Sequence, residues 1–104
     1  MVKVTIHMNA LPEKLKELKQ ALVSLVGSIR ETQGCSSCDF CCSAEDENEL
    51  CLFEEWEGLE VLANHLKSDI FKVLLGAMSL LKAPHEVKVY QEMKPKSGCV
   101  GASS

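Results

Sequence analysis

The stretch that most constrains the fold of this chain is residues 50–71, where a strand leads into a short helix. Apolar side chains occupy both alternating sets of positions along the expected strand, residues 50–56. Gly58 ends the strand pattern before the helix begins. A sheet that helices cover on one side usually has a polar second face. We therefore expect the second face of this strand to meet another subunit.

The short helix at the end of this stretch is expected to bury one apolar stripe, formed by Leu59, Leu62 and Leu66. Asn64 and His65 lie beside this stripe in the helical pattern. His65 is therefore expected to face the gap between the helix and the sheet, next to apolar side chains.

The remaining elements follow from two periodicities. Apolar and polar residues alternate in the strands, whereas apolar residues recur every three or four positions in the helices. The resulting order, strand–helix–strand–strand–helix–strand, is the ferredoxin-like α+β arrangement with an antiparallel sheet. Residues 1–93 then form one domain, and residues 94–104 form a flexible polar tail. Besides the stretch above, the expected elements are strand 2–9, a helix from Pro12 to Gly34, strand 35–43, a helical piece at 70–81 and strand 86–93.

Charge and hydropathy exclude some classes of partner. The net charge is −4 and acidic residues gather at positions 45–60, so we expect no nucleic-acid binding. The amino terminus has neither the basic start nor the apolar block of a signal peptide. No apolar run approaches the roughly 18 residues of a membrane helix. We expect a cytoplasmic protein without membrane contact, whose six cysteines are not a disulfide framework.

Several short motifs carry a family resemblance that extends over residues 2–91. The chain resembles the antibiotic biosynthesis monooxygenase family of small quinol-monooxygenase-like proteins. The resemblance implies a homodimeric α+β barrel in which two sheets pack face to face. It also implies oxidation of a small aromatic or quinol by molecular oxygen, without any cofactor. The motifs are Gly34-Cys35, Phe53-Glu54-Glu55-Trp56-Glu57, Ala63-Asn64-His65-Leu66-Lys67-Ser68 and Phe71-Lys72.

A haem-degrading branch of the same superfamily uses an Asn, a Trp and a His. Asn9 matches the Asn of that branch, but its Trp falls on His65 and its His falls on Leu75. Two of the three positions differ, so the resemblance disfavours haem degradation.

The candidate catalytic residues are His65, Asn9 and Asn64. An imidazole titrates near neutral pH, so His65 is the candidate base for a phenol or quinol proton. Asn9 or Asn64 would orient an oxygen atom, although strict alternation places Asn9 on the sheet face away from the helices. The alternatives are a half-buried structural histidine and a surface asparagine. The candidate substrate-binding residues are Trp56, Phe40 and Leu52, and packing is the competing role for Trp56.

Four cysteines, Cys35, Cys38, Cys41 and Cys42, have a spacing that suggests a metal site if they lie in a loop. On a strand, residues three apart point to opposite faces and lie about 10 Å apart. We therefore expect buried thiols that act as small apolar side chains, and no metal. Cys99 lies in the tail and is expected to be exposed.

Two other functions are alternatives to the monooxygenase hypothesis. An isomerase of a small carbonyl compound on the same fold would use His65 without oxygen. A non-catalytic binding or metal protein would use the cysteine cluster instead.

Overall fold

The protein, seen here in a computed structural model, is described over residues 1–91. Its elements follow the expected order, which confirms the ferredoxin-like α+β class. The expected tail, Cys99 and the last two residues of the predicted final strand lie outside the described residues. The elements are β1 (Val2–Asn9), η1 (Pro12–Lys14), α1 (Leu15–Arg30), β2 (Cys35–Cys42), β3 (Glu49–Trp56), α2 (Leu59–Leu66), α3 (Asp69–Ala77), η2 (Met78–Leu80) and β4 (Glu86–Gln91).

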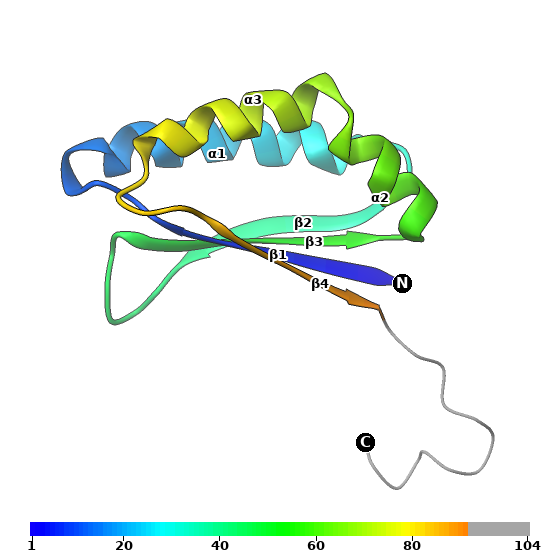
Figure 1. Ribbon diagram of the computed structural model, residues 1–104, viewed down its shortest axis with the longest axis horizontal. Helices are drawn as coiled ribbons and strands as arrows, with labels where there is room; N and C mark the ends of the chain where they lie inside the picture. The colour runs from blue at the N-terminus through cyan, green and yellow to red at the C-terminus, as the bar shows by residue number, and fades with distance from the viewer. Residues whose placement is uncertain (92–104) are drawn as a thin grey trace, which may run out of the picture.

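The molecule has two layers. The four strands form one antiparallel sheet in the order β2-β3-β1-β4. Helices α1, α2 and α3 lie on one face of this sheet, and no element of residues 1–91 covers the other face, called the open face below (Figure 1). No helix among these residues has the length and apolar character needed to span a bilayer.

Strand register assigns each side chain to a face. Ile6 pairs with Leu52 and Met8 with Leu50, so the apolar sets of β1 and β3 share the face under the helices. Helix α1 packs its apolar stripe on that face. The core buries sixteen side chains and is formed by Val2, Val4, Ile6, Met8, Ala10, Leu18, Leu22, Leu25, Val26, Ile29, Cys38, Leu50, Leu52, Trp56, Leu62 and Leu74.

The expected stripe on α2 is only partly right. Leu62 is buried, but Leu59 and Leu66 are 52% and 44% exposed. His65 takes the second inward position of this helix and is 2% exposed. The sheet beneath α2 presents the Trp56 ring to this position, and the imidazole stacks on it.

A side-chain cap marks the break between α2 and α3. Ser68 is the N-cap of α3, and its side chain accepts a hydrogen bond from the Phe71 backbone N–H at 3.2 Å. The Ser68 hydroxyl also donates to the His65 carbonyl at 2.6 Å. This double contact fixes the end of the helix that carries His65.

Candidate functional site

A small polar and aromatic cluster lies between the sheet and α2. His65 of α2 stacks on Trp56 of β3, with ring centroids 4.5 Å apart and planes inclined by 29°. Phe71 of α3 meets the other side of the imidazole edge-on at 5.6 Å. The indole Nε1–H donates a 2.8 Å hydrogen bond to Glu54 Oε1. The imidazole is therefore enclosed by two residues of β3, Glu54 and Trp56, and by one residue of α3, Phe71.

The cluster leaves polar atoms without partners. The distance from His65 Nε2 to Glu54 Oε1 is 3.7 Å, which is too long for a hydrogen bond. Both ring nitrogens of His65 and Glu54 Oε2 are buried without a hydrogen-bond partner among the described residues. Each such group carries a desolvation cost of about 1–3 kcal/mol. The aromatic contacts with Trp56 and Phe71 satisfy none of these polar atoms, so the cluster has the character of a functional site.

Burial moves the acid and the base of the cluster toward their neutral forms. It raises the pKa of Glu54, against the opposing effect of the Trp56 hydrogen bond. It lowers the pKa of His65. An imidazole with a lowered pKa is neutral at physiological pH and can accept a proton.

A cavity of about 450 Å³ lies beside this cluster, at the end of α1 and along α2. It brings together two of the predicted catalytic residues, because Asn64 and His65 both line it. The His65 side chain itself has no exposed area, so it forms part of the wall without contacting water. The remaining lining residues are Thr32, Gln33, Glu60, Val61 and Ser68.

The other predicted site residues do not line this cavity. Trp56 is completely buried beneath His65, and Leu52 is completely buried in the core. Phe40 of β2 is half-buried and packs on the edge of the same core. Asn9 lines a different cavity, described next, so the structure does not bring it together with His65.

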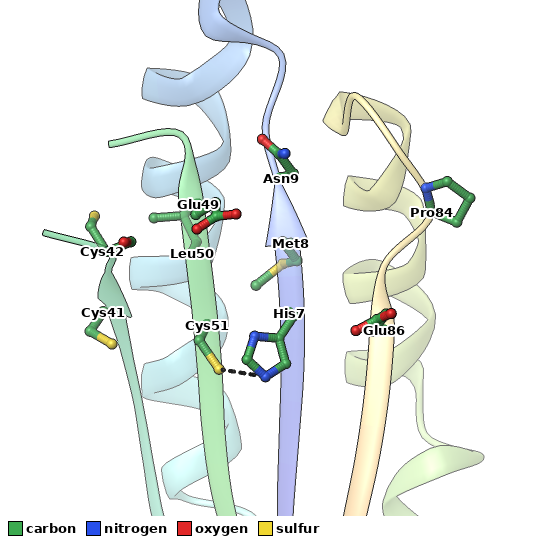
Figure 2. Close-up of a pocket in the computed structure, with 11 residues that line it drawn as sticks. His7, Met8, Asn9, Cys41, Cys42, Glu49, Leu50, Cys51, Pro84 and Glu86 are labelled. Atoms are coloured by element: carbon green, nitrogen blue, oxygen red, sulfur yellow. Dashed lines mark hydrogen bonds between the residues drawn. The ribbon is translucent and has the colours of Figure 1, made fainter. Parts of the chain in front are cut away.

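A second cavity, of about 400 Å³, lies at the hairpin end of the sheet. Figure 2 shows His7, Cys51 and Glu86 at one level of three neighbouring strands, with Cys41 beside Cys51 on β2. The thiol of Cys51 lies 3.9 Å from His7 Nε2. The sequence pattern indicates no chemistry for His7 or Cys51. The register of β1 on β3, which joins them, depends on contacts distant in sequence.

The cysteine strand has one feature that alternation alone does not predict. The register of β2 on β3 shifts between Cys35 and Ser37. Because of this β-bulge, Cys35 pairs with Trp56 and Cys38 pairs with Glu54, both on the face under the helices. The expectation that thiols three residues apart point to opposite faces is therefore wrong for this pair. It is right for Cys38 and Cys41, because regular pairing continues after the bulge.

Burial explains the inert character of the inner thiol. Cys38 is 1% exposed, and burial together with the charge of Glu54 raises its pKa to about 12. A thiol with so high a pKa is a poor nucleophile and metal ligand near neutral pH. Cys38 therefore behaves as the small apolar side chain expected from the sequence. Cys41 and Cys42 are exposed, so the expectation of buried thiols is wrong for these two.

Glu54 belongs to the site although no role was assigned to it from the sequence. It lies on the helix side of β3, on the same face as Leu52 and Trp56. Its neighbours are the Trp56 indole and the His65 imidazole. Glu54 and Trp56 are two positions apart on one strand, so their side chains lie on the same face. This spacing is the feature of the sequence that could have indicated their hydrogen bond.

Comparison with known proteins identifies the family. The family model described as antibiotic biosynthesis monooxygenase matches residues 1–75 of this chain. None of the curated proteins matches the chain. The match runs from β1 into α3 and includes every residue of the Glu54–Trp56–His65–Phe71 cluster.

Solved structures with the same fold support this assignment. A conserved protein from Methanosarcina mazei Go1 is 26% identical, covers 88% of this chain and 92% of its own, and has a TM-score of 0.83. Rv0793 from Mycobacterium tuberculosis is 27% identical, with 92% and 98% coverage and a TM-score of 0.81. A protein named antibiotic biosynthesis monooxygenase shares the fold at 19% identity, 90% and 100% coverage and a TM-score of 0.83. The resemblance read from the sequence is thus confirmed, and this chain belongs to the antibiotic biosynthesis monooxygenase family.

Proposed function

We propose that the protein is a monooxygenase that oxidises a small aromatic or quinol substrate with molecular oxygen, without a cofactor. The observation that carries this proposal is the buried imidazole of His65, whose two nitrogens lack partners at the wall of the 450 Å³ cavity. Family membership supports the class of reaction. The volume suits one small ring system.

In the proposed mechanism, His65 accepts the hydroxyl proton of the bound quinol or phenol. The resulting anion is electron-rich and supplies the electrons that reduce oxygen. One oxygen atom enters the product, and the other leaves as water. Asn64 shares the cavity and orients an oxygen atom through its amide. Because the imidazole is sealed from solvent, the mechanism requires a cavity side chain to move when substrate binds.

The neutral state of His65 supports its role as base. If Glu54 or His65 took up a proton before the substrate bound, the net charge of the cluster beside the Trp56 indole would change. Burial favours the neutral imidazole, which is the form that can accept a proton. The stacked Trp56 and the edge of Phe71 hold the ring in one orientation, which reduces the cost of positioning it for proton transfer.

We expect the variant His65→Phe to remain folded and to lose at least about 100-fold in kcat/KM for quinol oxidation. Phenylalanine keeps an aromatic ring on Trp56 but removes the nitrogen that accepts the proton. Oxygen uptake with a panel of quinols is the measurement. The matched control is His85→Phe, a histidine outside both cavities, which should keep the wild-type rate.

The pH profile gives a second readout of the same base. Activity should fall as acid protonates His65, and because burial lowers its pKa, this fall should occur below the usual imidazole value of 6.5. Full activity of His65→Phe would show that His65 is not the base. If the protein converts a carbonyl substrate under strict anaerobiosis and shows no oxygen-dependent reaction, the isomerase hypothesis replaces the monooxygenase hypothesis.

We also propose that the protein is a homodimer through the open face of the sheet. Phe53 and Tyr90 lie on this face and are 44% and 51% exposed. Apolar surface of this kind is buried by association in many oligomers. Sedimentation at micromolar concentration should give twice the chain mass, and Phe53→Glu should give a monomer. A wild-type chain that sediments as a monomer contradicts the dimer.

The cytoplasmic location expected from the sequence is part of this proposal. Five cysteines of the described chain are free thiols: Cys35, Cys38, Cys41, Cys42 and Cys51. Free thiols of this number suit a reducing compartment.

A further inference from the structure

Glu54 of β3 is a buried carboxyl that the proposed mechanism does not use. It is 2% exposed and does not line the 450 Å³ cavity, so it can act on a substrate only through another residue. A buried carboxylate is usually paired with a cation, but within residues 1–91 no lysine or arginine pairs with this one. The cations that form ion pairs have other partners: Lys14 pairs with Glu17, Arg30 with Asp39 and Lys72 with Asp69.

Two neighbouring side chains face the Glu54 carboxyl instead. The Trp56 Nε1–H donates to Oε1 at 2.8 Å, which favours the ionised carboxyl over the protonated one. The imidazole nitrogen on this side is His65 Nε2, which lies 3.7 Å from the same oxygen. An ionised carboxyl has no proton, so it can only accept hydrogen bonds. The group that it can accept from on the His65 side is therefore an Nε2–H.

This placement determines which nitrogen of His65 is free to act. A neutral imidazole carries its proton on one nitrogen, and only the other nitrogen can accept a second proton. We propose that Glu54 is a positioning residue, which holds the proton of His65 on Nε2 and so leaves Nδ1 to accept the substrate proton. This inference rests on the proposed role of His65 as the base. A third group that orients the base is a recurring arrangement in enzymes that use histidine.

The 3.7 Å separation belongs to the site without substrate. A hydrogen bond between nitrogen and oxygen spans about 2.7–3.2 Å, so the two atoms need to approach by roughly 0.5–1 Å. Such contacts are often long in a free enzyme and shorten in the complex with substrate. Glu54 Oε2 has no partner among the described residues, so rotation of the carboxyl toward the ring breaks no hydrogen bond at that atom.

The same carboxylate stabilises the charge that forms during the reaction. When Nδ1 accepts the substrate proton, His65 becomes an imidazolium, and Glu54 is its counter-ion. The other titratable groups around the pair do not replace it. Cys38, opposite Glu54 on β2, has a thiol pKa of about 12 and stays neutral, and burial also raises the pKa of Cys35. Glu60 of α2 is exposed at the cavity, where solvent and salt screen its charge.

The first test reads the tautomer of His65 directly, on the full chain labelled with nitrogen-15 and without substrate. A long-range proton–nitrogen correlation spectrum distinguishes a ring nitrogen that carries hydrogen from a bare one. The signals of His65 are those that disappear in His65→Phe. We expect Nε2–H in the wild type at neutral pH. In Glu54→Gln the side-chain amide can donate to Nε2 while its carbonyl keeps the Trp56 hydrogen bond, so we expect Nδ1–H.

The second test measures quinol oxidation. Glu54→Gln should lower kcat by at least about tenfold and change KM by less than about twofold, because Glu54 does not line the cavity. The acid limb of the pH profile should move to lower pH, since loss of the negative charge destabilises the imidazolium and lowers the pKa of His65. The matched control is Glu57→Gln, an exposed carboxyl one position beyond β3, which should keep the wild-type kcat and acid limb.

Two results would overturn the proposal. One is a wild-type His65 that carries its proton on Nδ1, and this measurement needs no variant. The other is a folded Glu54→Gln protein with the wild-type kcat while His65→Phe is inactive, since His65 would then be a base that Glu54 does not position. A wild type that oxidises no quinol would contradict the proposed function alone, because the spectrum tests the tautomer without any turnover.

Discussion

The variant Trp56→Ala should lose about 3–5 kcal/mol of unfolding free energy. Trp56 is the largest completely buried side chain of the described structure. Its removal leaves a cavity between the sheet and α2, beneath the stacked ring of His65. It also removes the N–H donor of Glu54 Oε1, which leaves this buried carboxyl without a hydrogen bond. A urea titration followed by far-UV circular dichroism measures the loss, because the variant has no tryptophan fluorescence.

Trp56→Phe separates packing from hydrogen bonding. Phenylalanine fills much of the indole volume and can stack on His65, but it has no N–H for Glu54. We expect a smaller loss than for alanine, of about 1–3 kcal/mol, close to the cost of an unsatisfied buried polar group. Protein concentration is held fixed, since association adds to apparent stability. A loss below about 1 kcal/mol for Trp56→Ala would contradict its placement at the centre of the core.

The sequence was sufficient for the architecture because periodicity is a local property. Alternation from Val2 to Met8 and the three- and four-residue steps of α1 specify which face of each element is buried. Gly58 and Ser68 are the N-cap residues of α2 and α3 and so mark the boundaries of these helices. These signals need no knowledge of the partner element, so the order of elements and the face of β1 toward the helices were predicted correctly.

Helix α2 was predicted only in part: His65 faces the gap between the helix and the sheet as expected, but Leu59 and Leu66 of the expected apolar stripe are exposed. The helical periodicity of apolar residues alone predicted that Leu66 of α2 is buried. Leu66 is nevertheless exposed, and His65 is buried. What decides between them is the surface beneath the helix, where Glu54 and Trp56 supply a polar atom and a ring. That surface comes from another element, and a pattern read within one helix does not contain it.

Register is the second property that periodicity leaves open. A bulge of one residue at β2 places Cys35 and Cys38 on the same face, contrary to simple alternation. The same register makes Cys41 and Cys51 direct neighbours. Two thiols ten positions apart in the sequence become a pair only when the hairpin closes with this register.

The variant Gly34→Ala should lose about 2–5 kcal/mol of unfolding free energy, for two independent reasons. Gly34 has a φ of 89°, in the left-handed region, where an L side chain costs about 1–2 kcal/mol. A Cβ added there would lie 2.6 Å from the Cβ of Val61 and 2.8 Å from both of its methyl carbons. Relief of such overlap typically costs about 1–3 kcal/mol. Urea titration of the variant measures the sum.

Gly27→Ala is the matched control, since it makes the same chemical change in the middle of α1. An added Cβ at Gly27 meets nothing within 4 Å, so alanine should stabilise the helix by about 0.5–1 kcal/mol. The two substitutions should therefore change stability in opposite directions. A neutral result for Gly34→Ala would show that neither the backbone angle nor the contact with Val61 constrains this turn.

Gly34→Asn distinguishes the two causes of the loss. Asparagine tolerates the left-handed conformation better than alanine, but its Cβ occupies the same place beside Val61. If the contact dominates, Gly34→Asn should be as unstable as Gly34→Ala. Val61 belongs to α2, so the contact would also push the helix that carries His65 away from Trp56. We therefore expect Gly34→Asn to reduce quinol oxidation even at temperatures where the protein is folded, which links the glycine of this turn to the position of the proposed base.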